Sequence, residues 1–347
     1  MNLSAVRPKT TFTLPEDAEA TEPPEARGLA RDEVRLLVAS GTGLTHARFR
    51  ELPRFLRPGD LVVVNTSATL PAAVDGQLSD GRPVVVHFST PVAGAADSRW
   101  VVELRAPDGS GPVLDASPGD QVTLPGGVGL VLHEPADARS AGTRLWRASV
   151  AAEGSLTAWL ARHGRPISYG YLRGRWPLAD YQPVFAREPG SAEMASAGRP
   201  FTDRLVTDLV TRGIAVAPVL LHTGVSSQEL GEGPQDERFR VPPATARQVE
   251  GARRSGGRVV AVGTTVARAL ESSAGAAAEG WTDVVIGPDH PPRVVTGLIT
   301  GWHPPDASHL LLLEAVAGTD LVKDAYRAAV AERYRWHEFG DSCLFLP

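Results

Sequence analysis

Helix-like and strand-like segments alternate from residue 155 to the end of the chain, and this alternation limits the fold more than any other feature. Apolar runs typical of strands lie at 35–40, 60–65, 213–221, 258–263, 294–300 and 342–346. Segments with helical spacing lie at 155–164, 201–213, 243–257, 308–318 and 321–336. Strands that alternate with helices usually form parallel sheets covered by helices on both faces. The sequence therefore predicts an α/β fold with a mostly parallel α/β/α body.

The stretch from residue 70 to residue 150 breaks this alternation. It contains short β-rich runs separated by Gly, Pro and Asp, at 82–89, 99–105, 121–125, 127–134 and 143–150. Short strands of this kind are typical of a small antiparallel barrel or sandwich. We therefore predict two domains, an α/β catalytic body from residues 1–69 and 151–347 and an inserted β-barrel from residues 70–150.

Composition excludes several classes of protein. The formal net charge of the 347 residues is −5, which argues against a surface that binds nucleic acid everywhere, because such binding needs excess Lys and Arg. The only cysteine, Cys343, lies among apolar residues. A buried thiol and a reducing compartment follow from this. No apolar run is long enough to span a membrane, so we expect a cytoplasmic protein without membrane contact.

The junction between a strand and a helix at 257–271, GRVVAVGTTVARALE, has the residues of a ligand cradle. Gly263 permits close approach of the backbone to a ligand, and Thr264 and Thr265 stand where a helix begins. A helix start offers free amides and partial positive charge. The simpler alternative is a capped turn without a ligand.

Two histidines occupy comparable places, because His222 follows the strand at 213–221 and His303 follows the strand at 294–300. Ligands of open α/β sheets bind beyond the carboxyl ends of the strands. Both histidines are therefore predicted to face one cleft with Thr264 and Thr265, the alternative being that each makes an ordinary polar contact. Paired spacings such as HExxH or CxxC and a GxSxG elbow are absent from the sequence, and we expect no metal site.

Seven motifs in a fixed order resemble the S-adenosylmethionine:tRNA ribosyltransferase-isomerase family of queuosine biosynthesis. They are RPGDLVVVNTSATLPA at 57–72, YQPVFAREPGS at 181–191, SAGRPFT at 196–202, LLHTGVSSQ at 220–228, GGRVVAVGTTVARALES at 256–272, VVTGLITGWHPPDASHLLLLEAVAG at 294–318 and DAYRAAVAERYRWHEFGDSCLFL at 324–346. The resemblance runs almost end to end, and it identifies the chain as a divergent member of this family.

The resemblance implies a reaction in which the ribosyl group of S-adenosylmethionine moves to a 7-aminomethyl-7-deazaguanine base in tRNA. The products are epoxyqueuosine in the tRNA, adenine and methionine. S-adenosylmethionine is then a co-substrate, tRNA is the expected partner, and neither a metal nor a redox cofactor is implied. The family fold, an α/β body with an inserted β-barrel, agrees with the organisation predicted above. We expect a monomer.

The resemblance also implies which residues form the site. His222 or Glu237 is expected to transfer a proton, and His303 to position the sugar or act as the partner acid. Arg333 and Asp341 are expected to bind the carboxylate and the ammonium of the methionine moiety. The expected substrate-binding residues are Asn65, Ala197, Gly198, Gly224, Gly263, Thr264, Thr265, Arg268, Arg333, Tyr334 and Asp341.

The chain departs from the family pattern around the expected acceptor. Ala68 and Ala73 stand where the family has arginines, and Arg199 and Pro200 replace a leucine–histidine pair. The donor cradle is thus retained while acceptor positions differ. Two alternatives remain open: the same ribose chemistry on a small-molecule or other nucleoside acceptor, and a non-catalytic paralogue that binds S-adenosylmethionine or RNA.

Overall fold

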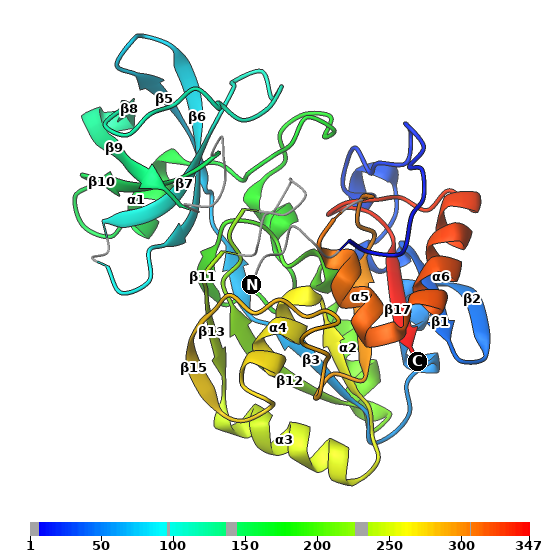
Figure 1. Cartoon of the computed structure of the whole chain (residues 1–347). Helices are drawn as coiled ribbons and strands as arrows, with labels where there is room; N and C mark the ends of the chain where they lie inside the picture. The colour runs from blue at the N-terminus through cyan, green and yellow to red at the C-terminus, as the bar shows by residue number, and fades with distance from the viewer. Residues whose placement is uncertain (1–6, 96–97, 137–143, 226–234, 306) are drawn as a thin grey trace.

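The protein consists of an α/β body and a β-barrel that lies to one side of it in the computed structural model (Figure 1). The structure describes residues 7–95, 98–136, 144–225, 235–305 and 307–347. The serine pair at 226 and 227 in the LLHTGVSSQ motif lies outside the described residues. Both the α/β class and the inserted antiparallel barrel are confirmed.

A nine-stranded sheet forms the centre of the body, in the order β15-β13-β12-β3-β14-β16-β17-β1-β2. Its strands are β1 (Arg35–Ser40), β2 (Gly43–Arg48), β3 (Leu61–Asn65), β12 (Ala215–Leu221), β13 (Glu237–Val241), β14 (Val259–Val262), β15 (Ala278–Thr282), β16 (Gly297–Gly301) and β17 (Ser342–Leu346). A short parallel pair, β4 (Ser67–Thr69) and β11 (Glu188–Ser191), lies apart from it.

The sheet is mixed, with a parallel centre. β12, β3, β14 and β16 run parallel to one another, and β17 is parallel to β1. The pairs β16–β17, β12–β13, β13–β15 and β1–β2 are antiparallel. β17 runs antiparallel to β16. Two helices, not one, connect these strands, so the chain enters β17 at the same end of the sheet at which it left β16. Gly301 accordingly pairs with Ser342.

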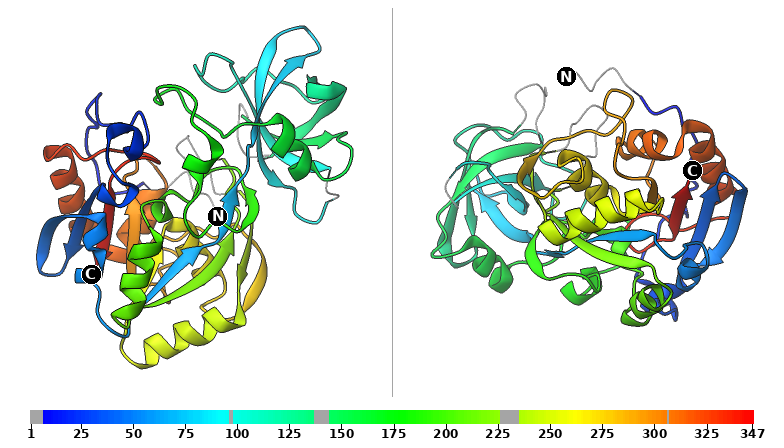
Figure 2. Two further views of the ribbon diagram at one scale, coloured as in Figure 1. Left: turned by 180° about the vertical axis from the view of Figure 1, so that it is seen from behind. Right: turned by 90° about the horizontal axis from the view of Figure 1, so that it is seen from below.

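Helices cover both faces of the sheet (Figure 2). Alternate strand residues point to opposite faces, so Leu61 and Val63 contact one core and Val62 and Val64 the other. One face packs on α3 (Pro243–Arg254), α4 (Thr264–Ser272), α5 (His309–Ala317) and α6 (Thr319–Ala331), and the other on α2 (Asp203–Thr211). Among the described helices, none has the length and apolar character needed to cross a membrane.

The barrel is closed, in the order β10-β7-β6-β5-β8-β9. Its strands are β5 (Ala73–Leu78), β6 (Pro83–Pro91), β7 (Arg99–Arg105), β8 (Gln121–Leu124), β9 (Val128–Pro135) and β10 (Leu145–Val150). Its core includes Phe88, Val102 and Leu104, and α1 (Leu156–His163) packs on the same core through Trp159 and Leu160.

Residues near the N-terminus lie over the body and bind its C-terminal segment. The backbone of Trp336 bonds to Ala18 and Ala20, and Thr10 donates two hydrogen bonds to the carboxylate of Glu314. Arg199, one of the residues that depart from the family pattern, is buried and forms an ion pair of 2.8 Å with Glu25. Its guanidinium therefore binds the N-terminal segment to the body and is not directed at a substrate.

The expected buried thiol is confirmed. Cys343 in β17 has no exposed surface, and burial raises the pKa of its thiol well above the ordinary value. A thiol of this kind is unreactive because the nucleophilic form is the thiolate. Cys343 is therefore part of the core.

Candidate active site

A cavity of about 890 Å³ lies where the body meets the barrel. Its lining comes from the start of α4, the loops after β12 and β16, the segment 167–171, the 192–197 loop and Arg105 of the barrel. Cavities of this size hold a nucleoside-sized ligand with room for a second group. The cavity lies at the carboxyl ends of β14 and β16, the position predicted from the sequence for a ligand.

The cradle at the start of α4 forms part of this cavity. Gly263 has φ 92° and ψ 158°, a conformation open to glycine but not to residues with a Cβ. Its N–H donates to the carbonyl of Ile299 at 2.8 Å, which joins β14 to β16. Gly263, Thr264, Thr265 and Arg268 all line the cavity. The structure thus brings a helix N-terminus and two hydroxyls to one wall.

Asn65 supports the cradle from behind, outside the cavity lining. Its amide donates to the carbonyl of Leu221 at 2.8 Å and to Thr265 Oγ1 at 3.4 Å, and its oxygen accepts from the N–H groups of Leu221 and Ser67. One buried side chain therefore fixes the ends of β3 and β12 relative to α4.

His303 lies on the same wall and stacks on a histidine that the sequence analysis did not identify. The rings of His303 and His309 are 4.5 Å apart and 1° from parallel. His303 Nε2 is 3.0 Å from Thr300 Oγ1. Burial lowers the pKa of His303 well below the ordinary value and that of His309 to about 4. Both imidazoles are therefore neutral at neutral pH.

Glu237 lines the cavity but is engaged in fixing its wall. It forms an ion pair with Arg268 and accepts a hydrogen bond of 2.9 Å from the N–H of Gly224. Arg268 also donates to the carbonyls of Val284 and Thr282. A Cβ on Gly224 would lie 2.6 Å from Ser89 Oγ, so a side chain there would displace this hydroxyl.

His222 lies outside the residues that line the cavity. Its Nδ1 is 2.7 Å from Ser67 Oγ, which is 2.6 Å from Ser191 Oγ, and the N–H of Thr223 donates to that second hydroxyl at 3.0 Å. Burial, with the nearby charge of Arg238, lowers the pKa of His222 to about 4. His222 thus holds together segments that frame the site.

The predicted residues near the C-terminus are also remote from the cavity lining. Arg333 is largely exposed and pairs with Asp17. Tyr334 is buried, with its hydroxyl 2.8 Å from His46 Nδ1. Asp341 accepts hydrogen bonds from the N–H groups of Arg35 and Arg335, at 2.7 and 2.8 Å. Asp341 therefore fixes the turn that leads into β17 against the start of β1.

The short helical turn Ser196–Gly198 contributes Ala197 to the cavity lining. Its neighbour Gly198 is buried behind it, where a Cβ would contact Pro183 and Phe185. Ala197 in turn packs near Gly263, because a Cβ on that glycine would lie 3.4 Å from the methyl group of Ala197.

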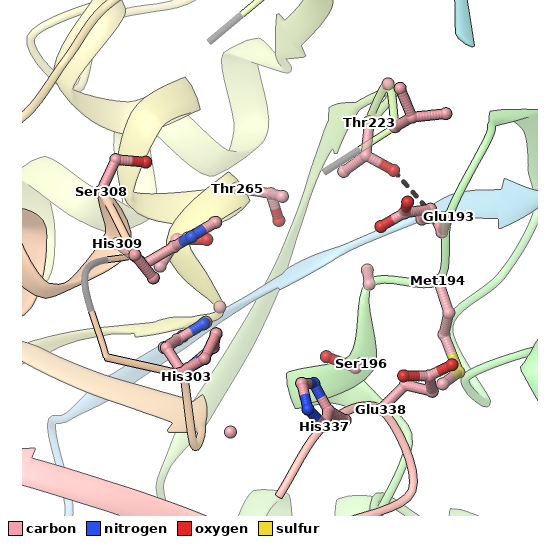
Figure 3. Close-up of a pocket in the computed structure, with 18 of the residues that line it drawn as sticks. Glu193, Met194, Ser196, Thr223, Thr265, His303, Ser308, His309, His337 and Glu338 are labelled. Atoms are coloured by element: carbon pink, nitrogen blue, oxygen red, sulfur yellow. Dashed lines mark hydrogen bonds between the residues drawn. The ribbon is translucent and has the colours of Figure 1, made fainter. Parts of the chain in front are cut away.

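Two tyrosine–carboxylate pairs form a further wall, which the sequence analysis missed. The hydroxyl of Tyr169 donates to Glu193, and that of Tyr171 donates to Glu338. The Tyr171 ring stacks on His337 with centroids 4.3 Å apart. Figure 3 shows His337 and Glu338 across the cavity from His303 and His309, with Glu193 beside Thr223. The two tyrosines, Glu193, and the pair His337 and Glu338 come from three separate segments of the chain, and no sequence spacing links them.

Glu338 is the carboxyl group most altered by this environment. Burial raises its pKa to about 7, the charge of Glu193 adds to the rise, and the hydrogen bond from Tyr171 opposes it. The cavity therefore combines neutral imidazoles with a carboxyl group that titrates near neutrality. Titratable groups whose pKa values are strongly shifted by their surroundings are typical of proton-transfer sites.

Comparison with known proteins identifies the family of this chain. A family model described as "Queuosine biosynthesis protein" matches residues 8–345. The chain belongs to this family. Two relatives named S-adenosylmethionine:tRNA ribosyltransferase-isomerase illustrate the similarity. The one from Geobacter sulfurreducens is 35% identical over 352 residues, which cover 96% of this chain and 98% of the relative. The one from Moorella thermoacetica is 37% identical over 353 residues, with the same coverage.

A solved member of the queuosine biosynthesis family has the same fold. It is the crystal structure of S-adenosylmethionine tRNA ribosyltransferase from Thermotoga maritima, which is 27% identical. The superposition covers 96% of this chain and 98% of that chain, with a TM-score of 0.52. The family resemblance read from the motifs is therefore confirmed.

Proposed function

We propose that this protein is an S-adenosylmethionine-dependent tRNA ribosyltransferase-isomerase. In this proposal it transfers the ribosyl group to a 7-aminomethyl-7-deazaguanine base in tRNA, forms epoxyqueuosine, and releases adenine and methionine in the cytoplasm. The observation that carries the proposal is the near full-length match to proteins of that name together with a cavity built on the glycine–threonine cradle.

The donor is assigned to the body side of the cavity. The N-terminus of α4 presents amides after Gly263 and the hydroxyls of Thr264 and Thr265. Such groups suit the hydroxyls and ring nitrogens of a nucleoside. Arg268 and Glu237 neutralise each other, so they serve to hold the cradle.

His303 is assigned as the proton acceptor in the first chemical step because it is neutral and lines the cavity, although burial makes it a weaker base than an ordinary imidazole. The positive sulfur of the donor acidifies the hydrogens on the adjoining ribose carbon. A neutral imidazole in the cavity takes one of them, and the electron pair left behind forms a carbon–carbon double bond as the adjoining bond to the ring oxygen breaks. The freed oxygen then forms a carbonyl group with the anomeric carbon, the bond from that carbon to adenine breaks, and the imidazolium returns its proton to the leaving adenine. Proton transfer by a positioned side chain contributes about 10²–10⁴-fold to a rate. His222 is not needed for this step, because it lies behind the cavity wall.

The experiment that tests the proposal is incubation of the protein with S-adenosylmethionine and an anticodon stem-loop RNA that carries the aminomethyl base. Mass analysis of the nucleosides should show the added ribosyl group, with one adenine released per modified base. An unmodified base in the presence of bound donor would overturn the assignment of tRNA as acceptor.

Replacement of two family arginines by Ala68 and Ala73 supports testing a second acceptor. Ala73 is buried, and its methyl group offers no cation to a phosphate. If adenine is released with the free aminomethyl nucleoside but not with the RNA, the same ribose chemistry acts on a small molecule. Donor binding without adenine release under either condition would indicate a binding protein.

A further inference from the structure

Glu338 differs from the other acidic groups of the site in its surroundings. Glu237 is bound by Arg268, whereas within the described residues no arginine, lysine or histidine forms an ion pair with Glu338. Its side chain lines the cavity opposite His303 and receives the hydroxyl of Tyr171 (Figure 3). Glu338 therefore faces the cavity as a carboxylate that no positively charged side chain in the described part of the chain neutralises.

The proposed reaction brings a cation to this place. The acceptor is a primary amine, which is an ammonium ion at neutral pH and has no electron pair for attack on carbon. A base in the cavity must therefore remove one of its protons. We infer that Glu338 is this base, a catalytic residue for the acceptor amine, and this inference rests on the proposed function.

The step balances without a further reagent. One N–H bond of the ammonium breaks, its electron pair stays on nitrogen, and the proton forms a carboxyl group on Glu338. The neutral nitrogen then gives its electron pair to an electron-poor carbon of the opened ribose, and the π bond at that carbon breaks as its electrons move to the adjoining atom. The proton later exchanges with water, which restores the carboxylate.

The acid–base properties of Glu338 suit this role. A pKa of about 7 makes its carboxylate a stronger base than an ordinary one, and a base works best when its pKa lies near the working pH. The titratable and charged groups that face it are Glu19, Tyr171, Tyr181, Glu193, His303 and His337. Glu19 and Glu193 raise its pKa, and the Tyr171 hydroxyl lowers it.

Tyr171 acts as a positioning residue for this base. Its hydroxyl donates to the carboxylate, and its ring is fixed by the stack on His337. Tyr171→Phe keeps the ring and removes the hydrogen bond, so the pKa of Glu338 should rise. Because the base must be deprotonated, the midpoint of the acidic limb of kcat/KM for the acceptor should move to higher pH.

The test uses the full-length protein, S-adenosylmethionine and the stem-loop RNA with the aminomethyl base. Glu338→Gln should lower kcat/KM for the RNA by about a hundredfold and change donor affinity by less than about twofold. Glu332→Gln is the matched control, since Glu332 is an exposed carboxylate on the same segment, and it should behave as the unchanged protein does.

A second acceptor separates the chemical role from a structural one. A stem-loop with a hydroxylamine in place of the amine is uncharged at neutral pH and needs no base. With this probe the loss caused by Glu338→Gln should shrink to less than about tenfold. An equal loss with both probes, or an unmoved pH midpoint in Tyr171→Phe, would overturn the inference.

The outcomes also separate this inference from the proposed function. If the unchanged protein modifies the RNA and Glu338→Gln does so equally fast, only the role of Glu338 is overturned. If the unchanged protein modifies neither the stem-loop nor the free aminomethyl nucleoside, the proposed function and the role of Glu338 are both overturned. Modification of the nucleoside alone, with the same dependence on Glu338, would assign the amine to a small molecule.

Discussion

The imidazole rings of His303 and His309 lie face to face, with centroids 4.5 Å apart and planes 1° from parallel. Each is desolvated by its surroundings. The pKa of His303 falls through burial first and the proximity of His309 second. The pKa of His309 falls through burial first and the charge of Arg268, across the cradle, second. Burial is therefore the main reason that both imidazoles are neutral at neutral pH.

Replacement of His303 should stop the first chemical step. His303→Asn removes the imidazole that we assign as proton acceptor but keeps a polar group near Thr300 Oγ1, so the fold should persist. We expect turnover to fall by at least about a hundredfold, with the dissociation constant of S-adenosylmethionine changed by less than about threefold. The measurement is adenine release under donor saturation.

The control for this substitution is His290→Asn, because His290 is exposed and does not line the cavity. It should leave adenine release unchanged. Full activity of His303→Asn would show that the proton is taken by another group.

Substitution of His309 should alter the pH dependence of stability. The folded-state pKa of about 4 lies below the ordinary 6.5, so unfolding takes up a proton between these values. The free energy of unfolding should therefore fall as the pH is lowered from 6.5 toward 4, by up to about 1.4 kcal/mol per pH unit from this group. In His309→Leu that contribution is absent.

The measurement is urea unfolding of both proteins at several pH values between 7.5 and 4.5. All other titrating groups are shared, among them Glu338, whose raised pKa has the opposite effect. The variant should gain stability relative to the unchanged protein as the pH falls. Parallel curves would contradict a depressed pKa for His309.

The fold was predictable because its strands are apolar and its turns are marked by Gly, Pro and Asp. β3, β12 and β14 all stand where their patterns indicate. β5 was missed because Gly76 and Asp75 obscure its pattern. The structure explains the glycine, since a Cβ on Gly76 would lie 2.6 Å from Val122 Cγ1 of β8. Close contact between two barrel strands leaves no periodic trace in a single sequence.

Only the cavity residues that follow the carboxyl ends of strands were predictable from the sequence. That rule located Thr265 and His303, which line the cavity. It also selected His222, whose side chain turns to Ser67, because the position of a residue along the backbone does not fix the direction of its side chain. Tyr171 and Glu338 meet through tertiary packing across 167 positions of sequence, and neither follows a strand of the parallel centre.

His222 should act through its hydrogen bond to Ser67. His222→Asn retains a polar group for that bond and should keep turnover within about fivefold of the unchanged protein. His222→Ala leaves Ser67 without this partner, which should cost about 1–3 kcal/mol of stability and lower turnover by displacing Thr223. The measurements are thermal unfolding and kcat for both variants. A loss of kcat of about a hundredfold in His222→Asn, with normal stability, would indicate that His222 transfers a proton.

The cradle should depend on the backbone conformation of Gly263. At φ 92° and ψ 158° a side chain is strained, and the added Cβ would also lie 3.4 Å from Ala197. Gly263→Ala should therefore cost about 1–3 kcal/mol of folding free energy and turn the amides that begin α4 away from the donor. Gly251→Ala is the matched control, because Gly251 lies inside α3 with open space around it. It should raise stability by about 0.5–1 kcal/mol and leave donor affinity unchanged.

Chemical unfolding measures the stability of both variants, and titration with S-adenosylmethionine measures their donor affinity. Equal donor affinity in the two variants would show that the α4 N-terminus is not part of the donor site.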